Sequence, residues 1–102
     1  MTNAYMEVDG NQFFMTLDGH ATGREDVCAA VSCIAVTLAG YAVNAQREGR
    51  VKILKMDLGD AKAILKCRGD EQFSGAFEAA TIGLLQLQNQ FPEQVFVEVK
   101  KE

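Results

Sequence analysis

The spacing of the apolar residues changes abruptly after residue 18. Residues 12–18 alternate apolar and polar side chains, which predicts a β-strand with Phe13, Met15 and Leu17 on one face. Residues 26–45 instead repeat apolar side chains every three or four positions, which predicts a helix of about five turns. Its apolar face consists of Val27, Val31, Ile34, Leu38, Tyr41 and Ala45. We therefore expect a buried helix that packs against a sheet or another helix.

The remaining segments repeat these two patterns. Residues 4–8 form another alternating run, and Asp9-Gly10 between the first two runs is a strong hairpin signal. Residues 51–58 and 61–67 are predicted as two further strands around a Gly59-Asp60 turn, with Cys67 facing inward. A helix over 60–68 is the alternative, because alanine, lysine and leucine are good helix formers.

The C-terminal third predicts a second helix and a last strand. Asp70 is the expected N-cap of this helix, and Pro92 ends it. The apolar stripe of the helix consists of Phe73, Phe77, Ala80, Leu84, Leu87 and Phe91. Val95, Val97 and Val99 then alternate with Phe96, Glu98 and Lys100, which predicts the last strand.

The order of these segments predicts an α+β fold. Strand-strand-helix-strand-strand-helix-strand fits a two-layer sandwich, with two helices on one face of a sheet of about five strands. A length of 102 residues is enough for one domain with one core, so residues 1–102 are predicted to form a single domain. The uncovered sheet face and the small-residue face of the first helix are candidate surfaces for a homodimer.

Composition narrows the classes of function. No apolar run approaches the roughly 18 to 20 residues that span a bilayer, and the N-terminus lacks a signal sequence, so we expect a cytoplasmic protein without membrane contact. A net charge of −4 with scattered basic residues argues against direct binding to nucleic acid. With one histidine and no Cys-x-x-Cys, neither a metal site nor a cofactor is expected. Cys33 and Cys67 are expected to be core thiols.

One histidine and one cysteine lie close together in the chain. His20 follows the second predicted strand and Cys28 lies near the start of the first predicted helix. A thiolate nucleophile paired with an imidazole that holds and returns a proton is the chemistry of a cysteine protease. Spacing alone favours the simpler interpretation, in which His20 is a surface residue and Cys28 is a buried structural thiol.

The position of the helix start decides how Cys28 is placed. If Asp26 is the N-cap, Cys28 lies in the first turn, where unpaired amides favour a thiolate and can bind an oxyanion. If Thr22 and Glu25 form a capping box, Cys28 lies deeper in the helix. The sequence is compatible with both starts.

Two short motifs carry a family resemblance. Gly19-His20-Ala21, followed by Asp26-Val27-Cys28-Ala29-Ala30-Val31-Ser32, resembles the signature of the bacterial ribosomal-processing cysteine protease family, Prp, in which a GHA motif precedes a D-I-V-C-A-x-x-S motif. The predicted order of strands and helices also looks like that family's small α+β fold.

The resemblance implies an activity and a set of site residues. Prp proteases remove a short N-terminal extension from ribosomal large-subunit protein twenty-seven, so the implied partner is a ribosomal protein precursor. Carried over by match, Cys28 would be the nucleophile and His20 its acid/base partner. Ser32 would support the thiol, Asp26 would act as a cap and loop anchor, and Gly19 belongs to the first motif.

One departure from the family leaves alternatives open. The family carries a longer, glycine-containing loop between its histidine and cysteine, whereas only residues 21–27 intervene here. A divergent or phage-borne member that cleaves another protein, such as a capsid or scaffold component, is one alternative. A non-catalytic peptide-binding homologue is another. Gln12-Phe13-Phe14 also resembles the end of the family's cleaved extensions, although an aromatic strand is the simpler interpretation.

Overall fold

The protein folds in the predicted order of elements. A computed structural model describes residues 1–19, 23–59 and 61–102. Its elements are β1 (Thr2–Asp9), β2 (Gln12–Asp18), α1 (Glu25–Arg47), β3 (Val51–Leu58), β4 (Lys62–Gly69), α2 (Glu71–Gln90) and β5 (Val95–Lys101). The predicted α+β class, with a five-stranded sheet and two helices, is confirmed.

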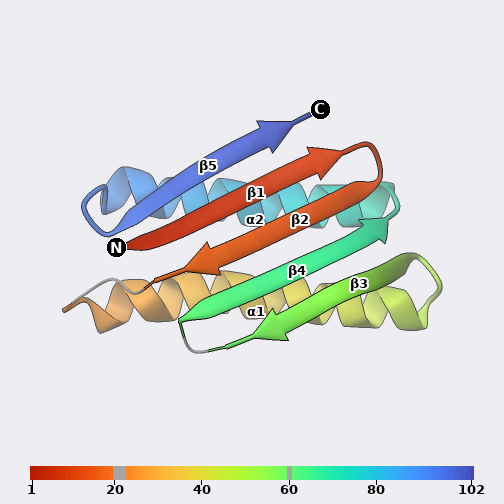
Figure 1. The fold of residues 1–102 in the computed structure, drawn as a ribbon, viewed down its shortest axis with the longest axis horizontal. Helices are drawn as coiled ribbons and strands as arrows, with labels where there is room; N and C mark the ends of the chain where they lie inside the picture. Colours follow the sequence, from red (N-terminus) through yellow and green to blue (C-terminus); the bar gives the residue numbers. More distant parts are fainter. Residues whose placement is uncertain (20–22, 60) are drawn as a thin grey trace.

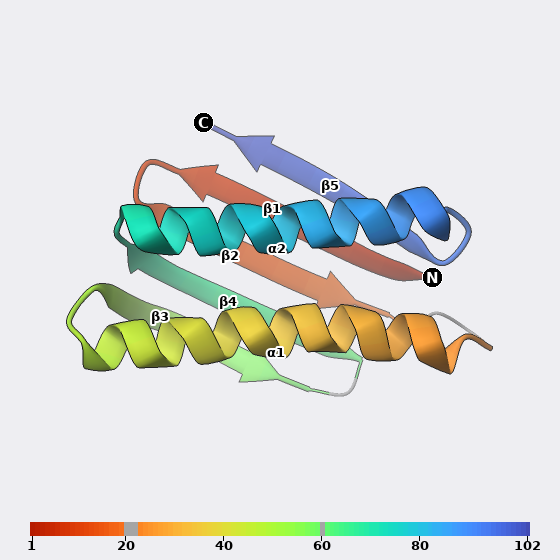
Figure 2. The same cartoon turned by 180° about the vertical axis from the view of Figure 1, so that it is seen from behind.

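The five strands form one mixed sheet in the order β3-β4-β2-β1-β5. β1 pairs in parallel with β5, and the other neighbouring strands are antiparallel. Both helices lie on the same side of the sheet and run roughly along the direction of the strands (Figures 1 and 2). None of the described residues forms a helix on the other side of the sheet, so the described structure has two layers.

Two local predictions are settled by the strand pairing. Asp9 pairs with Gln12, so the two-residue hairpin turn is Gly10–Asn11 and not Asp9-Gly10. Gly10 has a φ of +60°, which a glycine adopts without steric cost. Lys62–Gly69 forms strand β4, so the alternative of a helix over this segment is wrong, because β2 and β3 pair with the strand on both sides. Tertiary pairing thus outweighs the local helix propensity of this segment.

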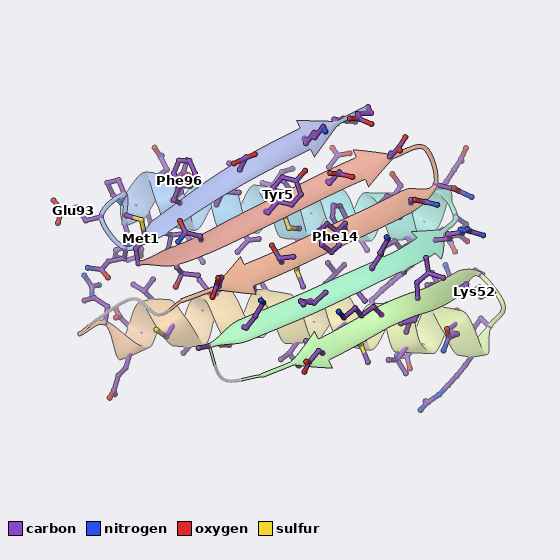
Figure 3. The ribbon with its side chains drawn as sticks, in the orientation of Figure 1. Met1, Tyr5, Phe14, Lys52, Glu93 and Phe96 are labelled. Carbon is purple, nitrogen blue, oxygen red and sulfur yellow. The ribbon has the colours of Figure 1, made fainter. Side chains whose placement is uncertain are left out.

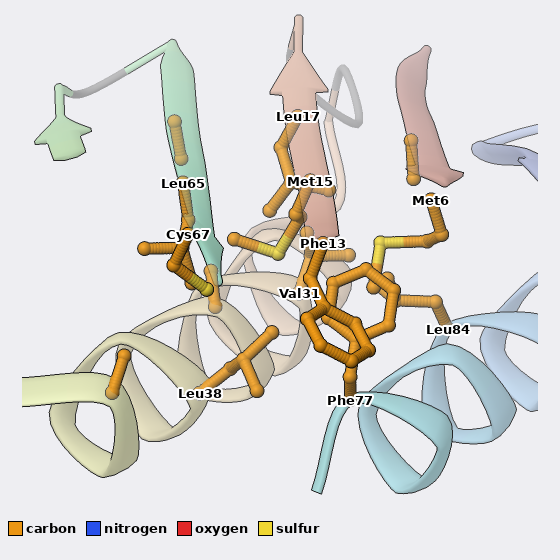
Figure 4. Close-up of a cluster of buried hydrophobic side chains, with 14 of the residues drawn as sticks. Met6, Phe13, Met15, Leu17, Val31, Leu38, Leu65, Cys67, Phe77 and Leu84 are labelled. Carbon is orange, nitrogen blue, oxygen red and sulfur yellow. The ribbon is translucent and has the colours of Figure 1, made fainter. Parts of the chain in front are cut away.

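The core fills the space between the sheet and the helices (Figure 4). Phe13 projects from β2 against two rings of α2, with ring centroids 5.0 Å from Phe73 and 5.2 Å from Phe77. Cys67 is buried as predicted, and burial raises the pKa of its thiol to about 11. Phe13 is therefore a core residue in a central strand, which favours the structural interpretation of Gln12-Phe13-Phe14.

Helix α1 corrects two expectations. Among the described residues it is long and apolar enough, by length and composition, to cross a membrane, with a mean hydropathy of 1.8 over 18 residues. The core helix of a globular fold passes the same test, and α1 packs on the sheet through its buried residues.

Cys33 was expected in the core but is exposed, because it points away from the sheet, between the buried Val31 and Ala35.

Helix α2 begins and ends as predicted. Asp70 is its N-cap, and its carboxylate accepts a hydrogen bond of 2.9 Å from the backbone N–H of Phe73. The helix ends at Gln90, two residues before Pro92. β5 then buries Val95 and Val97 against the core, whereas Val99 is exposed near the end of the strand.

Candidate active site

Helix α1 begins at neither of the two predicted positions. Its first residue is Glu25 and its N-cap is Arg24, which makes no side-chain capping bond. Asp26 therefore lies inside the helix, and the prediction that it is the N-cap is wrong. Glu25 opens the helix, so it does not occupy the third helical position that a capping box with Thr22 requires, and Thr22 itself lies outside the described residues.

Cys28 is the fourth residue of α1 and is half-buried. Its backbone N–H donates to the carbonyl oxygen of Arg24 at 3.1 Å, which is the first i→i−4 bond of the helix. Cys28 therefore lies in the first turn, but its own amide is already engaged and is not available to bind an oxyanion.

Arg24 explains why the helix begins where it does. Its guanidinium donates to both carboxylate oxygens of Asp26, at 3.1 and 2.9 Å, and lies 4.8 Å from the centre of the Phe91 ring at the end of α2. The hydrogen bond from Arg24 also holds the pKa of the Asp26 carboxyl below its ordinary value. Asp26 therefore anchors the start of α1 through Arg24, on the exposed side of the helix.

Cys28 borders a hollow of about 80 Å³ between α1 and the end of the sheet. Ser32 lies one helical turn further along α1 and lines the same hollow, as does Gly19 at the end of β2. We call it the Cys28 hollow. It is lined by Thr2, Leu17, Gly19, Cys28, Val31, Ser32, Ala35, Val36, Leu58, Gly59, Ala61, Lys62 and Ala63.

The backbone requires a glycine at position 19. Gly19 has a φ of +93°, a conformation that side chains disfavour, and its N–H donates to the carbonyl oxygen of Ala61 at 2.9 Å. A Cβ atom at this position would overlap the carbonyl oxygen of Met1. Gly19 thus ties the end of β2 to the start of β4 at the edge of the Cys28 hollow.

The structure brings together three of the five predicted site residues. Cys28, Ser32 and Gly19 line one hollow, whereas Asp26 is exposed and faces Arg24 instead. His20 lies outside the described residues.

Sequence reasoning missed most of the wall of the hollow. Val36 and Leu58 are apolar side chains with exposed fractions of 58% and 45%, and they come from α1 and the end of β3. Thr2 comes from the start of β1. Their positions depend on the order of strands in the sheet, so no local pattern indicates that they meet. The one signal that could have suggested Val36 and Leu58 as wall residues is their apolar character at positions that are exposed to solvent near a thiol.

The described structure is thus a two-layer α+β fold with a half-buried cysteine in the first turn of its first helix. We compared the sequence and this fold with those of known proteins. Neither a protein-family model nor a curated protein matches the sequence. Among solved structures, SMU.848 from Streptococcus mutans shares 27% sequence identity over 100% of this chain and 96% of its own, with a TM-score of 0.70.

Two further structures are of the essential ribosomal processing protease Prp from S. aureus. One is in complex with a substrate peptide and the other with a covalently linked product peptide. They share 16% and 17% identity with this chain, each over 98% of this chain and 100% of the other, with TM-scores of 0.67. The chain therefore has the fold of the Prp protease, and the predicted resemblance is confirmed at the level of the fold.

Proposed function

We propose that this protein is a cysteine endopeptidase in which Cys28 is the nucleophile and His20 is its acid/base partner. The observation that carries the proposal is the placement of Cys28 at a hollow that Gly19 also lines. His20 directly follows Gly19, and consecutive Cα atoms are about 3.8 Å apart. We therefore assign the acid/base role to His20, the next residue of the chain after Gly19.

The structural neighbours support a covalent mechanism on a peptide. One Prp structure contains a substrate peptide and another a covalently linked product peptide, on the same fold. Cys28, Gly19 and Ser32 occupy the two motifs by which this sequence resembles Prp. The fold and the motifs are independent observations, and they favour the same activity.

The proposed reaction has two steps. His20 takes the proton of the Cys28 thiol, the thiolate adds to the scissile carbonyl carbon, and the C–N bond breaks as His20 returns the proton to the leaving amine. This step leaves a thioester on Cys28. Water, deprotonated by His20, then hydrolyses the thioester and restores the thiol. Ser32 would lie beside the thiol, one turn along the same helix face.

The proposed substrate is the N-terminal extension of a ribosomal large-subunit precursor, protein twenty-seven, in the bacterial cytoplasm. This choice rests on the motif resemblance and on the fold shared with a ribosomal processing protease. We also propose that the protein acts as a homodimer.

The activity can be tested with a peptide that carries the ribosomal extension. We expect wild-type protein to cleave it, and Cys28→Ala and His20→Ala each to lower kcat/KM by at least about 1,000-fold. Cys33→Ala is the matched control, because Cys33 is an exposed thiol on the same helix away from the hollow, and it should cleave like wild type. The readout is the mass of the two peptide products.

Three results would change the assignment. Equal cleavage by wild type and Cys28→Ala would exclude Cys28 as the nucleophile. Peptide binding without cleavage would favour a non-catalytic peptide-binding protein. If the ribosomal peptide stays intact, a comparison of protein N-termini in cells with wild type and with Cys28→Ala would reveal whether another protein is the substrate.

A further inference from the structure

β3 and β5 are the two outermost strands of the sheet, because the strand order is β3-β4-β2-β1-β5. Lys52 stands near the start of β3 and Phe96 near the start of β5 (Figure 3). The backbone N–H and C=O groups on the outer side of such a strand can pair with another extended segment. How each outer side is covered therefore indicates where such a segment can bind.

A glutamine from a helix covers part of each outer strand. The side-chain oxygen of Gln46 on α1 accepts from the backbone N–H of Ile53 on β3 at 2.7 Å. The side-chain oxygen of Gln88 on α2 accepts from the N–H of Val97 on β5 at 2.6 Å. β3 is also irregular, because its register with β4 shifts between Ile53 and Lys55. The first half of β3 is thus protected against pairing with another strand.

The second half of β3 has no such cover from the residues that the structure describes. Gly59 donates to the carbonyl oxygen of Lys62 at 2.8 Å, and the residues of an antiparallel strand face their neighbour alternately. Gly59 and Asp57 therefore face β4, whereas Met56 and Leu58 turn their N–H and C=O groups outward. We call this stretch, from Met56 to Leu58, the β3 edge.

The side chains of Met56 and Leu58 lie on the same side of the sheet as the helices. Their partners on β4, Leu65 and Ala63, are buried on that side, and paired residues share a face of the sheet. Met56 and Leu58 are nevertheless 40% and 45% exposed, because none of the described strands lies beyond β3. Leu58 also lines the Cys28 hollow, together with the exposed Val36 of α1. The β3 edge thus leads into the hollow.

We propose that an extended segment of the peptide substrate pairs with the β3 edge and so enters the Cys28 hollow. The main chain of the segment exchanges hydrogen bonds with Met56 and Leu58, which is the strand-addition mode of peptide recognition. Every second side chain of the segment lies on the side of the helices, against these two residues, and the side chains between them face solvent. The preferred substrate therefore has apolar residues two positions apart beside the scissile bond.

The length and the position of the β3 edge favour a peptide segment as the occupant. The sheet of another molecule would need a longer free strand, and Gln46 protects the first half of β3. Met56 lies two residues before Leu58, about 7 Å along the strand, so a segment bound at both residues continues directly into the hollow. This inference rests on the proposed function, because it specifies how the substrate of that same site is recognised.

Peptide binding to the Cys28→Ala variant tests the β3 edge separately from cleavage. The probe is a fluorescently labelled peptide that carries the ribosomal extension, and fluorescence anisotropy gives its Kd. In this background, Leu58→Ser should raise Kd about tenfold, because it removes an apolar contact. Met56→Pro should raise Kd about fivefold, because it removes an outward N–H but no bond to β4. Val99→Ser, at a 48% exposed position on the other outer strand, is the matched control and should leave Kd unchanged.

The backbone of the peptide provides a second measurement. Alternate amides of an added strand face the strand to which it is paired. Methylation of one peptide nitrogen at a time should therefore weaken binding at every second position of the docked segment. A peptide that tolerates methylation at every position would contradict strand addition.

The outcomes distinguish this inference from the proposed function. Binding that Leu58→Ser weakens, without cleavage by wild type, would support the β3 edge and contradict the peptidase. Cleavage with a kcat/KM that neither Leu58→Ser nor Met56→Pro changes would support the peptidase and overturn the β3 edge. The absence of peptide binding, or weaker binding by Val99→Ser alone, would also overturn it. Circular dichroism establishes that each variant is folded.

Discussion

Each helix of this protein follows a strand, but the two junctions differ in construction. Between β4 and α2 the connection is the single residue Asp70. Between β2 and α1 the chain spans residues 19–24 before the helix begins. Both junctions start a helix that packs on the same face of the same sheet (Figure 2). Comparing them shows how the length of a strand-to-helix connection affects the interactions and the space at the start of the helix.

The junction at Asp70 is closed by several interactions. Asp70 caps Phe73 and also accepts from Arg50 at 3.2 Å, while the Arg50 guanidinium lies 5.6 Å from the centre of the Tyr41 ring. Gly69 leaves no room for a side chain because Phe73 packs against it. This junction thus packs directly against the aromatic core, in which Phe73 contacts Phe13.

The junction before α1 is open by comparison. Arg24 caps the helix without a side-chain bond to the backbone, and its ion pair with Asp26 is exposed. The space next to this junction is the Cys28 hollow. We therefore expect the fold to depend more on the closed junction for its stability, whereas the open one borders the proposed active site.

The largest contrast is expected between the two buried side chains in the first turns of the helices. Phe73→Ala should lower the free energy of unfolding by about 4 kcal/mol, since the ring packs against Phe13 and Phe77. Val27→Ala, at the equivalent position of α1, should cost only about 2 kcal/mol. Urea unfolding measures both values, and equal losses would contradict the comparison.

A second prediction concerns the glycine that begins the open junction. Gly19→Ala should cost about 3 kcal/mol, because a positive φ is combined with overlap between the new Cβ and the Met1 carbonyl. Gly10→Ala is the matched control, since Gly10 also has a positive φ but no neighbour within 4 Å, and it should cost about 1 kcal/mol. If both variants lose the same stability in urea, the close approach to Met1 is unimportant.

The smallest contrast is expected between the two acidic residues. Asp70→Ala should lower Tm by roughly 4 to 8 °C, because it removes the N-cap and a partner of Arg50. Asp26→Ala removes only an exposed ion pair and should lower Tm by about 2 °C or less. Thermal unfolding followed by circular dichroism separates the two, and a larger effect at Asp26 would reverse their order.

The contribution of Asp70 should also depend on pH in a definite direction. The hydrogen bond from the Phe73 N–H, together with Arg50, holds the pKa of the Asp70 carboxyl below 3.8. Its stabilising effect is therefore present above about pH 4 and is lost as the pH falls through the pKa of the folded state. The Tm difference between wild type and Asp70→Ala should shrink below pH 4. A difference that stays constant down to pH 2 would argue against a charged cap.

The sequence predicted those features that depend on neighbouring residues. Period-two alternation identified β2, and the cap at Asp70 with the stripe from Phe73 onward identified α2. The start of α1 was not predictable, because Arg24 is positioned by Phe91, far away in the sequence. Cys33 was misplaced for a related reason, since the orientation of α1 on the sheet decides which of its faces is buried. The two motifs indicated Cys28, Ser32 and Gly19 as site residues. Thr2 and Leu58 also line the Cys28 hollow, but their places there depend on the order of the strands in the sheet, which no local pattern predicts.

The parallel pairing of β1 with β5 has a consequence for how the protein is made. Thr2 pairs with Val95, so β1 obtains this neighbour only after both helices and the strands between them have been synthesised. Until then the edge of β1 is exposed and can pair with other chains. Contacts between such distant segments also slow folding. We therefore expect the pairing of β1 with β5 to be a late step of folding.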